Sequence, residues 1–244
     1  MTPQVSENTA LLLDIDGTLL DLARTPDQVK VPRELVGALE SLARRLSGAL
    51  AFVSGRSLDS IDGLFAPFRP AAIGAHGGEV RAADGSIRRS KPLPEAVRQV
   101  FVGLADNIPG LLLEDKESAL ALHYRLAPEA LPVLTSAMTK HAPLFEAENI
   151  QLLYGKAVIE ARRQGVDKGT AVSLLVRQQP FAGRAVLFGG DDVTDEDVFR
   201  ILAGLGGRGF SVGRRIAGAE HHFETPRAVR EWLIRTAAAG QEAG

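Results

Sequence analysis

The chain has 244 residues, of which 45% are hydrophobic, and its 28 Lys and Arg nearly balance 30 Asp and Glu to give a net charge of −2. This composition is typical of a globular protein and gives no indication of nucleic acid or an acidic membrane surface as a partner. The lack of cysteine excludes disulfides, thiol catalysis and cysteine-bound metals. Because neither a signal peptide nor a membrane span is apparent, we expect a cytoplasmic protein.

Short apolar runs alternate with helical patterns in the first eighty residues. The leucine run at 11–13 is followed by leucines at helical spacing over 32–46, after a proline that suits a helix start. A strand over 49–53, a helix over 58–65 and a strand over 71–74 come next. This order predicts a doubly wound α/β fold with a parallel sheet.

The pattern changes after residue 79. A hairpin is expected over 79–88, and alternating strands and helical patterns then follow to residue 163. The expected helices span 93–104 and 128–141, and the expected strands span 111–116, 118–125, 145–153 and 156–162. We therefore predict a discontinuous α/β core over 1–80 and 164–244, interrupted by an α+β domain over 81–163.

The parallel pattern resumes near the end of the chain. Helices are expected over 170–178, 194–205 and 227–238, and strands over 184–188 and 209–212. Residues 204–209 match G-x-G-x-x-G, but they follow a helix and precede a strand, which is the reverse of a dinucleotide site. The pair His221-His222 has no third metal ligand nearby in the sequence.

The first strand ends in the string Asp14-Ile15-Asp16-Gly17-Thr18. Two carboxylates two residues apart on a strand point to the same side, and no Lys or Arg lies within seven residues of either. Burial of this like charge is costly unless a cation lies between the groups, and Mg²⁺ suits such oxygen ligands. The structural alternative is an acidic turn that simply ends a strand.

Other expected strands also end in residues suited to phosphate chemistry. Active sites of doubly wound sheets lie at the carboxyl ends of the strands. Ser54 opens a helix after a strand, where its alternative role is a helix cap. Lys168 begins a helix, where a cation is unfavourable for the helix dipole. The acidic string from Asp191 to Glu196 could equally form a capping box with Asp192 or Thr194 as cap.

The Asp14 string resembles the nucleophile motif of the haloacid-dehalogenase-like (HAD) phosphatases. That resemblance implies that Asp14 attacks phosphorus, that Asp16 is the general acid and base, and that Lys168 is catalytic. It implies that Thr18 and Ser54 bind the phosphoryl group, whereas Arg56 either reaches the leaving group or stays on the surface. The implied Mg²⁺ site comprises Asp14, the Asp16 carbonyl, Asp191 and Asp192, with Asp195 nearby as ligand or outer partner.

A narrower resemblance, to the trehalose-6-phosphate phosphatases, covers nearly the whole chain. Its most specific string is Gly190-Asp191-Asp192-Val193-Thr194-Asp195-Glu196, and further strings are His76-Gly77, Glu114-Asp115-Lys116, His123-Tyr124-Arg125 and Val158-Ile159-Glu160. The resemblance implies that the inserted domain is a cap that closes over trehalose 6-phosphate. The implied substrate-binding residues are Thr18, Ser54, Arg56, His76, Glu114, Lys116, Arg125, Lys156 and Glu160.

The cap residues also have a purely structural alternative, namely a cross-strand network of ion pairs on a solvated face. The expected partner is a small-molecule substrate, with no nucleic acid, no membrane and a monomeric chain. Other functions left open are a sucrose- or mannosylglycerate-type sugar-phosphate phosphatase, a phosphosugar mutase and an inactive regulatory module. Free phosphate as product would separate a phosphatase from a mutase.

Overall fold

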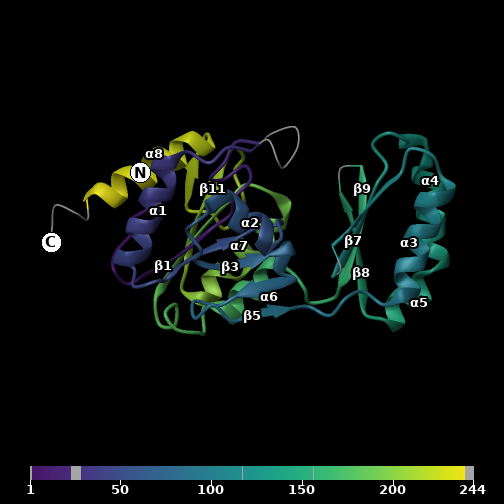
Figure 1. Cartoon of the computed structure of the whole chain (residues 1–244), viewed down its shortest axis with the longest axis horizontal. Helices are drawn as coiled ribbons and strands as arrows, with labels where there is room; N and C mark the ends of the chain where they lie inside the picture. The colour runs from purple at the N-terminus through teal and green to yellow at the C-terminus, as the bar shows by residue number, and fades with distance from the viewer. Residues whose placement is uncertain (1, 23–28, 117, 156, 240–244) are drawn as a thin grey trace. The chain divides into compact units, whose positions relative to one another are not determined.

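The computed structural model describes residues 2–22, 29–116, 118–155 and 157–239, and the chain forms two compact units (Figure 1). The core unit comprises Met1–Arg88 and Asp167–Gly244, and the inserted unit comprises Arg89–Val166. Each unit has its own cluster of buried hydrophobic side chains. The chain therefore leaves the first unit, completes the second and returns.

An eight-stranded sheet lies in the described part of the core unit, in the order β12-β11-β10-β1-β2-β3-β4-β5. Its strands are β1 (Thr9–Leu13), β2 (Leu50–Val53), β3 (Ala71–Gly74), β4 (Glu79–Arg81), β5 (Ile87–Arg89), β10 (Ala185–Gly190), β11 (Arg208–Val212) and β12 (His221–Phe223). The strands from β12 to β3 run parallel, and Leu11 of β1 is in register with Leu187 of β10 and Leu50 of β2. The predicted doubly wound α/β fold is confirmed.

Every residue of β1, β2 and β3 is buried, because helices cover both faces of the sheet. The helices are α1 (Arg33–Arg45), α2 (Leu58–Phe65), α6 (Lys168–Leu175), α7 (Glu196–Leu202) and α8 (Pro226–Ala239). Helix α1 packs beside α8, and α6 packs beside α7. The predicted leucine stripe of α1 is confirmed, since Leu35, Leu39 and Leu42 are all buried.

The hairpin of β4 and β5 extends the core sheet, although we expected the inserted domain to begin at residue 81. Strand β4 pairs antiparallel with β3. The Arg81 side chain is buried, where it bonds to the Asp62 carboxylate at 2.8 Å and to the Pro70 carbonyl at 3.0 Å. These bonds tie the hairpin to the core unit, so the inserted unit begins at Arg89.

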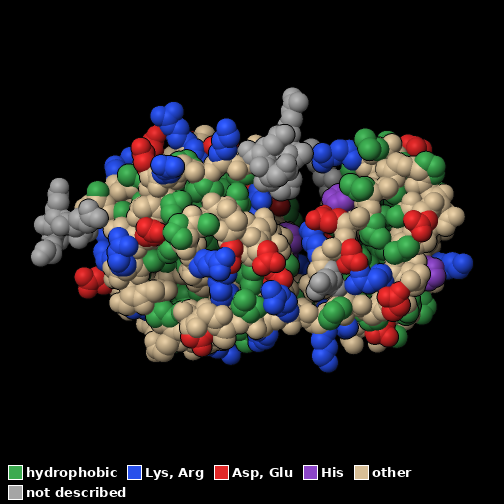
Figure 2. Space-filling model, viewed as in Figure 1, with side chains coloured by type: hydrophobic (Ala, Val, Ile, Leu, Met, Phe, Trp, Pro, Cys, Tyr) green, Lys and Arg blue, Asp and Glu red, His purple; other side chains and the backbone are tan. Residues whose placement is uncertain are grey.

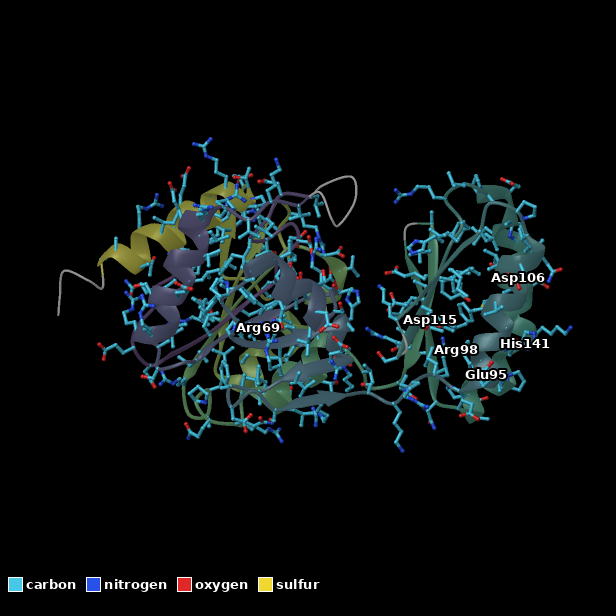
Figure 3. All side chains as sticks on the ribbon, viewed as in Figure 1. Arg69, Glu95, Arg98, Asp106, Asp115 and His141 are labelled. Atoms are coloured by element: carbon cyan, nitrogen blue, oxygen red, sulfur yellow. The ribbon has the colours of Figure 1, made fainter. Side chains whose placement is uncertain are left out.

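The inserted unit is an antiparallel sheet in the order β6-β7-β9-β8, with α3, α4 and α5 on one side of it (Figure 1). Its elements are α3 (Glu95–Asn107), β6 (Leu112–Asp115), β7 (Ala119–His123), α4 (Leu131–Lys140), α5 (Ala142–Ala147), β8 (Ile150–Gly155) and β9 (Val158–Arg163). Leu120, Leu122 and Ile159 on the covered face are fully buried. An ion pair between Arg98 of α3 and Asp115 of β6 joins a helix to the sheet (Figure 3).

The expected strand over 145–153 was wrong at its start. Residues Ala142–Ala147 form α5, and β8 begins only at Ile150. Phe145 packs edge-on against Phe101 of α3, with ring centroids 6.4 Å apart, so tertiary packing favours the helix. Asn149 then adopts φ 55°, a left-handed conformation that turns the chain out of the helix.

Strand β12 was not predicted from the sequence, because three residues at a sheet edge give little periodic signal. It is held in place by pairing with β11 and by a hydrogen bond between the Ser211 hydroxyl and His222 Nδ1 at 3.0 Å. On the face shown in Figure 2, acidic and basic side chains are interspersed over each unit. Among the residues that the structure describes, no helix combines the length and apolar character needed to cross a membrane.

Candidate active site

The candidate catalytic residues of the core unit lie where adjacent parallel strands end. Strand β1 pairs with both β2 and β10, so the residues just beyond these strands, Asp14, Ser54 and Asp191, meet at one edge of the sheet. The Asp14 amide donates to the Gly189 carbonyl of β10 at 2.9 Å, which fixes the backbone of Asp14 at this edge. The clustering predicted from the strand ends is therefore present.

Lys168, the first residue of α6, bridges two buried carboxylates. Its Nζ lies 2.8 Å from Asp14 Oδ1 and 2.6 Å from Asp195 Oδ1, and the three side chains are 3%, 6% and 0% exposed. Burial alone lowers the pKa of Lys168, but the two carboxylates outweigh burial and hold the pKa above its ordinary value. Lys168 is therefore a fixed positive charge beside Asp14.

Asp195 uses both of its carboxylate oxygens inside the protein. Oδ1 accepts from Lys168, and Oδ2 accepts from the backbone amides of Asp191 at 2.9 Å and Asp192 at 3.0 Å. A β-carbon on Gly190 would lie only 2.6 Å from the Asp195 carboxyl carbon, so glycine is needed for this close approach. Asp195 thus anchors Lys168 to the turn that carries Asp191.

Asp14, Asp191 and Asp195 form a carboxylate cluster in which one oxygen from each lies within 4.8 Å of the others. Burial, followed by repulsion from Asp195, raises the pKa of Asp14 well above its ordinary value. The same two causes raise the pKa of Asp191 to about 6. Three carboxylates beside one ammonium leave excess negative charge, so the cluster could bind a metal ion.

Within the cluster, Asp14 and Asp191 are the better direct metal ligands, because both Asp195 oxygens already accept hydrogen bonds. Asp191 Oδ1 accepts from the Thr18 hydroxyl at 3.1 Å. Gly17 adopts φ 83°, and a β-carbon there would lie 2.1 Å from Asp191 Oδ2. Glycine at position 17 therefore provides both the turn and the space for the carboxylate.

Asp192, which we expected among the metal ligands, does not lie in this cluster. Its exposed side chain caps the short helix Val193–Asp195, accepting from the Asp195 amide in a capping box. The capping alternative considered from the sequence is thus the geometry observed, and Asp195 rather than Asp192 contributes the third carboxylate.

Arg56 forms a two-pronged ion pair with Asp16. Its Nε lies 2.6 Å from Asp16 Oδ2 and its Nη2 lies 2.6 Å from Asp16 Oδ1. The Arg56 side chain is only 10% exposed, so the surface position considered from the sequence is wrong. This arrangement was not foreseen from the sequence.

Ser54 and His76 belong to neighbouring loops beside Arg56. Ser54 is almost fully buried, and its hydroxyl accepts from the Arg56 amide at 3.2 Å. The His76 ring lies against Gly55, since a β-carbon there would be 2.4 Å from His76 Nε2. His76 itself has φ 52°, a left-handed conformation that is uncommon for residues other than glycine.

Comparison with known proteins places this arrangement in a family. A family model described as trehalose-phosphatase matches residues 12–220. A probable trehalose-phosphate phosphatase of Sinorhizobium fredii is 42% identical over 91% of this chain and 84% of its own length. The trehalose-6-phosphate phosphatase of Escherichia coli is 38% identical over 95% of this chain and 88% of its own length.

The chain belongs to the trehalose-phosphatase family.

A solved structure agrees with this assignment. The crystal structure of a trehalose-6-phosphate phosphatase related protein superposes with a TM-score of 0.76 at 26% identity, over 96% of this chain and 99% of that one. The C-terminal domain of the Candida albicans trehalose-6-phosphate phosphatase, 24% identical, shares the fold with a TM-score of 0.77 over 96% of this chain and 93% of that one.

The inserted unit of this family member gathers charged side chains on the sheet face away from its helices. Glu114 of β6 and Glu160 of β9 are both in register with Ala121 of β7, so they lie on the same face. Glu114 Oε2 lies 3.6 Å from Lys116 Nζ and 3.2 Å from His123 Nε2. Arg125 is exposed just beyond β7, whereas Lys156 lies outside the described residues.

Some residues of the site were missed by sequence reasoning. Arg214 is exposed, yet its Nε donates to the Asp191 carbonyl at 3.0 Å and its Nη2 contacts Glu196 at 2.9 Å. His123 appeared only as part of a motif string, and its contact with Glu114 depends on pairing between β6 and β7. For Arg214, no local signal existed, because its partner is 23 residues away.

Proposed function

We propose that this protein hydrolyses trehalose 6-phosphate to trehalose and phosphate through an aspartyl-phosphate on Asp14. The observation that carries this proposal is the buried Asp14 carboxylate, held 2.8 Å from Lys168 at the carboxyl end of β1, in a member of the trehalose-phosphatase family. A carboxylate nucleophile divides a very slow phosphate-ester hydrolysis into two easier steps.

Mg²⁺ is the metal that we propose for the carboxylate cluster, with Asp14 and Asp191 as side-chain ligands and the Asp16 carbonyl as a further ligand. Hard carboxylate oxygens with room for water and phosphate suit Mg²⁺. When bound, the ion would supply positive charge that neutralises phosphoryl oxygens. Asp192 is not included, because it caps a helix.

The chain's own donors would complete the neutralisation of the phosphoryl group. Lys168 is a fixed ammonium beside Asp14, and the Ser54 hydroxyl comes from the loop that follows β2. The Thr18 hydroxyl, in the loop that follows β1, donates to Asp191 and would reach the phosphoryl group only by exchanging that bond. Such preorganised charge stabilises the phosphoryl-transfer transition state without reorganisation during the reaction. One Asp14 oxygen then bonds to phosphorus as the bond between phosphorus and the sugar O6 breaks.

Asp16 is the proposed general acid and base. Its carboxyl proton passes to O6 of the leaving trehalose, and the resulting carboxylate then accepts a proton from the water that attacks the aspartyl-phosphate. The products are phosphate and a regenerated Asp14. Asp16 follows Asp14 by two residues in the loop directly after β1, which supports this pairing of roles.

We propose that the inserted unit selects the sugar and acts as the cap domain. The charged face around Glu114, Lys116 and Glu160 offers paired donors and acceptors, as a neutral polyol requires. Arg125 and Lys156 are assigned to the same task by motif, and His76 is assigned from the core unit. The contacts among Glu114, Lys116 and His123 support a preorganised polar surface.

The experiment that tests the function measures Mg²⁺-dependent phosphate release. Trehalose 6-phosphate is compared with glucose 6-phosphate, sucrose 6-phosphate and mannosylglycerate phosphate, and Asp14→Asn serves as the inactive control. We expect a clear preference for trehalose 6-phosphate in kcat/KM. Preference for another sugar phosphate would overturn the assigned sugar but keep the chemistry, and an isomerised phosphate as product would indicate a mutase.

Replacing Glu114 with Gln should weaken recognition of the sugar while sparing the chemistry. The substitution removes the negative charge that Lys116 and His123 contact. Loss of a hydrogen bond to a charged group lowers binding affinity by about 10- to 100-fold. We expect kcat/KM for trehalose 6-phosphate to fall by that factor, mainly through KM, and kcat/KM for p-nitrophenyl phosphate to stay constant.

The matched control is Glu129→Gln, at an exposed position of the same unit. Equal loss on both substrates would mean that Glu114 does not contact the sugar.

A further inference from the structure

We propose that Arg56 is a positioning residue that orients the Asp16 carboxyl for proton transfer, and that the left-handed turn at Ala75 and His76 holds Arg56 in place. This inference rests on the proposed function. It assigns Arg56 a role different from the substrate contact implied by its motif.

The geometry of the Arg56 side chain points to Asp16 rather than to a ligand. Its Nε and Nη2 each lie 2.6 Å from a different Asp16 oxygen, which is the parallel two-bond arrangement that fixes a carboxylate in one plane. The side chain is 10% exposed, against 29% for Asp16. The carboxylate therefore has more access to solvent and substrate than the guanidinium that holds it.

The Arg56 side chain is itself fixed by a third contact. Its Nη1 donates to the Ser60 hydroxyl of α2 at 3.3 Å. A guanidinium that contacts α2 on one edge and Asp16 on the other has little freedom to swing toward a sugar. Lysine could replace the charge of Arg56 but not its two parallel donors.

The Arg56 backbone is held by the turn that follows β3. The Ala75 amide donates to the Arg56 carbonyl at 2.7 Å, and the His76 amide donates to the Ser54 carbonyl at 3.1 Å. Ala75 and His76 adopt φ values of 47° and 52°. Two successive non-glycine residues in this conformation are strained, and such strain is retained where surrounding contacts or function require it.

Gly74 provides the space in which this turn contacts the Arg56 backbone. A β-carbon at position 74 would lie 2.8 Å from the Arg56 carbonyl oxygen, although the Gly74 backbone has φ −112°, which any residue can adopt. Gly74→Ala should therefore displace Arg56 without creating backbone strain of its own. This makes position 74 a second, independent way to disturb Arg56.

The test compares kcat/KM for trehalose 6-phosphate and for p-nitrophenyl phosphate in Arg56→Met, Arg56→Lys and Gly74→Ala. This parameter reports the steps up to departure of the leaving group, and nitrophenolate leaves without needing a proton from Asp16. We expect Arg56→Met to lower the value about 100-fold for trehalose 6-phosphate and less than about fivefold for p-nitrophenyl phosphate. Gly74→Ala should show the same selectivity, and Arg56→Lys should recover part of the loss.

A double-mutant cycle with Asp16→Asn separates positioning from substrate binding. Single-turnover rates of trehalose release should be the same, within about threefold, in Asp16→Asn and in Asp16→Asn with Arg56→Met. An unchanged 100-fold effect of Arg56→Met in the Asp16→Asn background would overturn the proposal, because Arg56 would then act independently of Asp16. Wild-type behaviour of Gly74→Ala would overturn the claim that the turn at Ala75 and His76 holds Arg56 in place.

Two controls keep these outcomes distinct. Arg227→Met removes an arginine whose side chain is 79% exposed and pairs with Glu231 in the same helix, and it should leave both substrates unaffected. Failure of wild-type protein to hydrolyse trehalose 6-phosphate would refute the proposed function, whereas normal wild-type activity with an additive cycle would refute only the role of Arg56. Retained p-nitrophenyl phosphate activity shows that the variants are folded.

Discussion

Asp14→Asn is expected to reduce phosphate release from trehalose 6-phosphate on the order of 10⁵- to 10⁶-fold, the scale on which loss of a covalent nucleophile acts. The amide cannot form the bond to phosphorus, although its oxygen can still accept from Lys168. Initial rates at saturating substrate and Mg²⁺ measure the effect. Retention of activity within about tenfold of wild type would exclude the aspartyl-phosphate route.

The same substitution should not destabilise the metal-free protein. The pKa of Asp14 is raised by burial and by repulsion from Asp195, so its folded-state pKa lies above the unfolded value. Such a carboxyl contributes stability only while protonated, and that contribution is lost as pH rises through the folded pKa. At neutral pH the neutral amide removes this cost, so thermal unfolding in chelator should occur at or above the wild-type temperature.

Thermal unfolding in the presence of Mg²⁺ is the complementary measurement. Wild-type protein should gain thermal stability when Mg²⁺ is added, because the cation binds the folded carboxylate cluster. Asp14→Asn removes one of the proposed ligands and should gain less. An Asp14→Asn variant with a clearly lower unfolding temperature in chelator would show that the Asp14 charge stabilises the fold.

Lys168→Met is expected to have the second-largest effect, because one ammonium serves both the chemistry and the fold. Its removal leaves the buried Asp14 and Asp195 carboxylates without their shared partner. Removing one partner of a buried ion pair costs about 3–5 kcal/mol in the free energy of unfolding. Loss of a preorganised charge at the phosphoryl group should also lower kcat by roughly 10³-fold.

Denaturant unfolding and steady-state kinetics measure these two effects, with Lys140→Met at an exposed position of α4 as the control. The stability deficit should persist across neutral pH, because the neighbouring carboxylates keep the pKa of Lys168 above its ordinary value and the group stays charged. A Lys168→Met variant as stable as wild type would show that the negative charges of the two carboxylates are neutralised in another way, such as by protonation.

The sequence by itself determined the parallel core and its principal catalytic candidates. Alternating apolar strands and amphipathic helices predict a doubly wound sheet, and the carboxyl ends of parallel strands necessarily meet at one edge. Asp14 and Ser54 directly follow apolar runs, and Asp191 follows one after two glycines, so their convergence could be predicted without knowing any side-chain contact. Lys168 was identified as a candidate because a cation at the start of a helix is unfavourable for the helix dipole, which makes a purely structural role less expected.

Other features were decided only by the tertiary structure. Arg56 and Asp16 are 40 residues apart, and whether the guanidinium reaches the carboxylate depends on how the loops after β1 and β2 lie together. The choice between Asp192 and Asp195 depended on which side chain turns inward, because local acidic patterns fit either role. Likewise, the segment containing Phe145 is helical because its ring packs against Phe101.

In the inserted unit, too, some features could be predicted from the sequence and others depended on the tertiary structure. Alternation predicts that Glu114 and Lys116 share a face of a strand, since side chains alternate along it. It cannot predict that the His123 side chain reaches Glu114 across the strand pair, because that contact depends on the register between β6 and β7, in which His123 is opposite Leu112. Local patterns fix which residues can do chemistry, whereas long-range pairing and packing decide which of them meet.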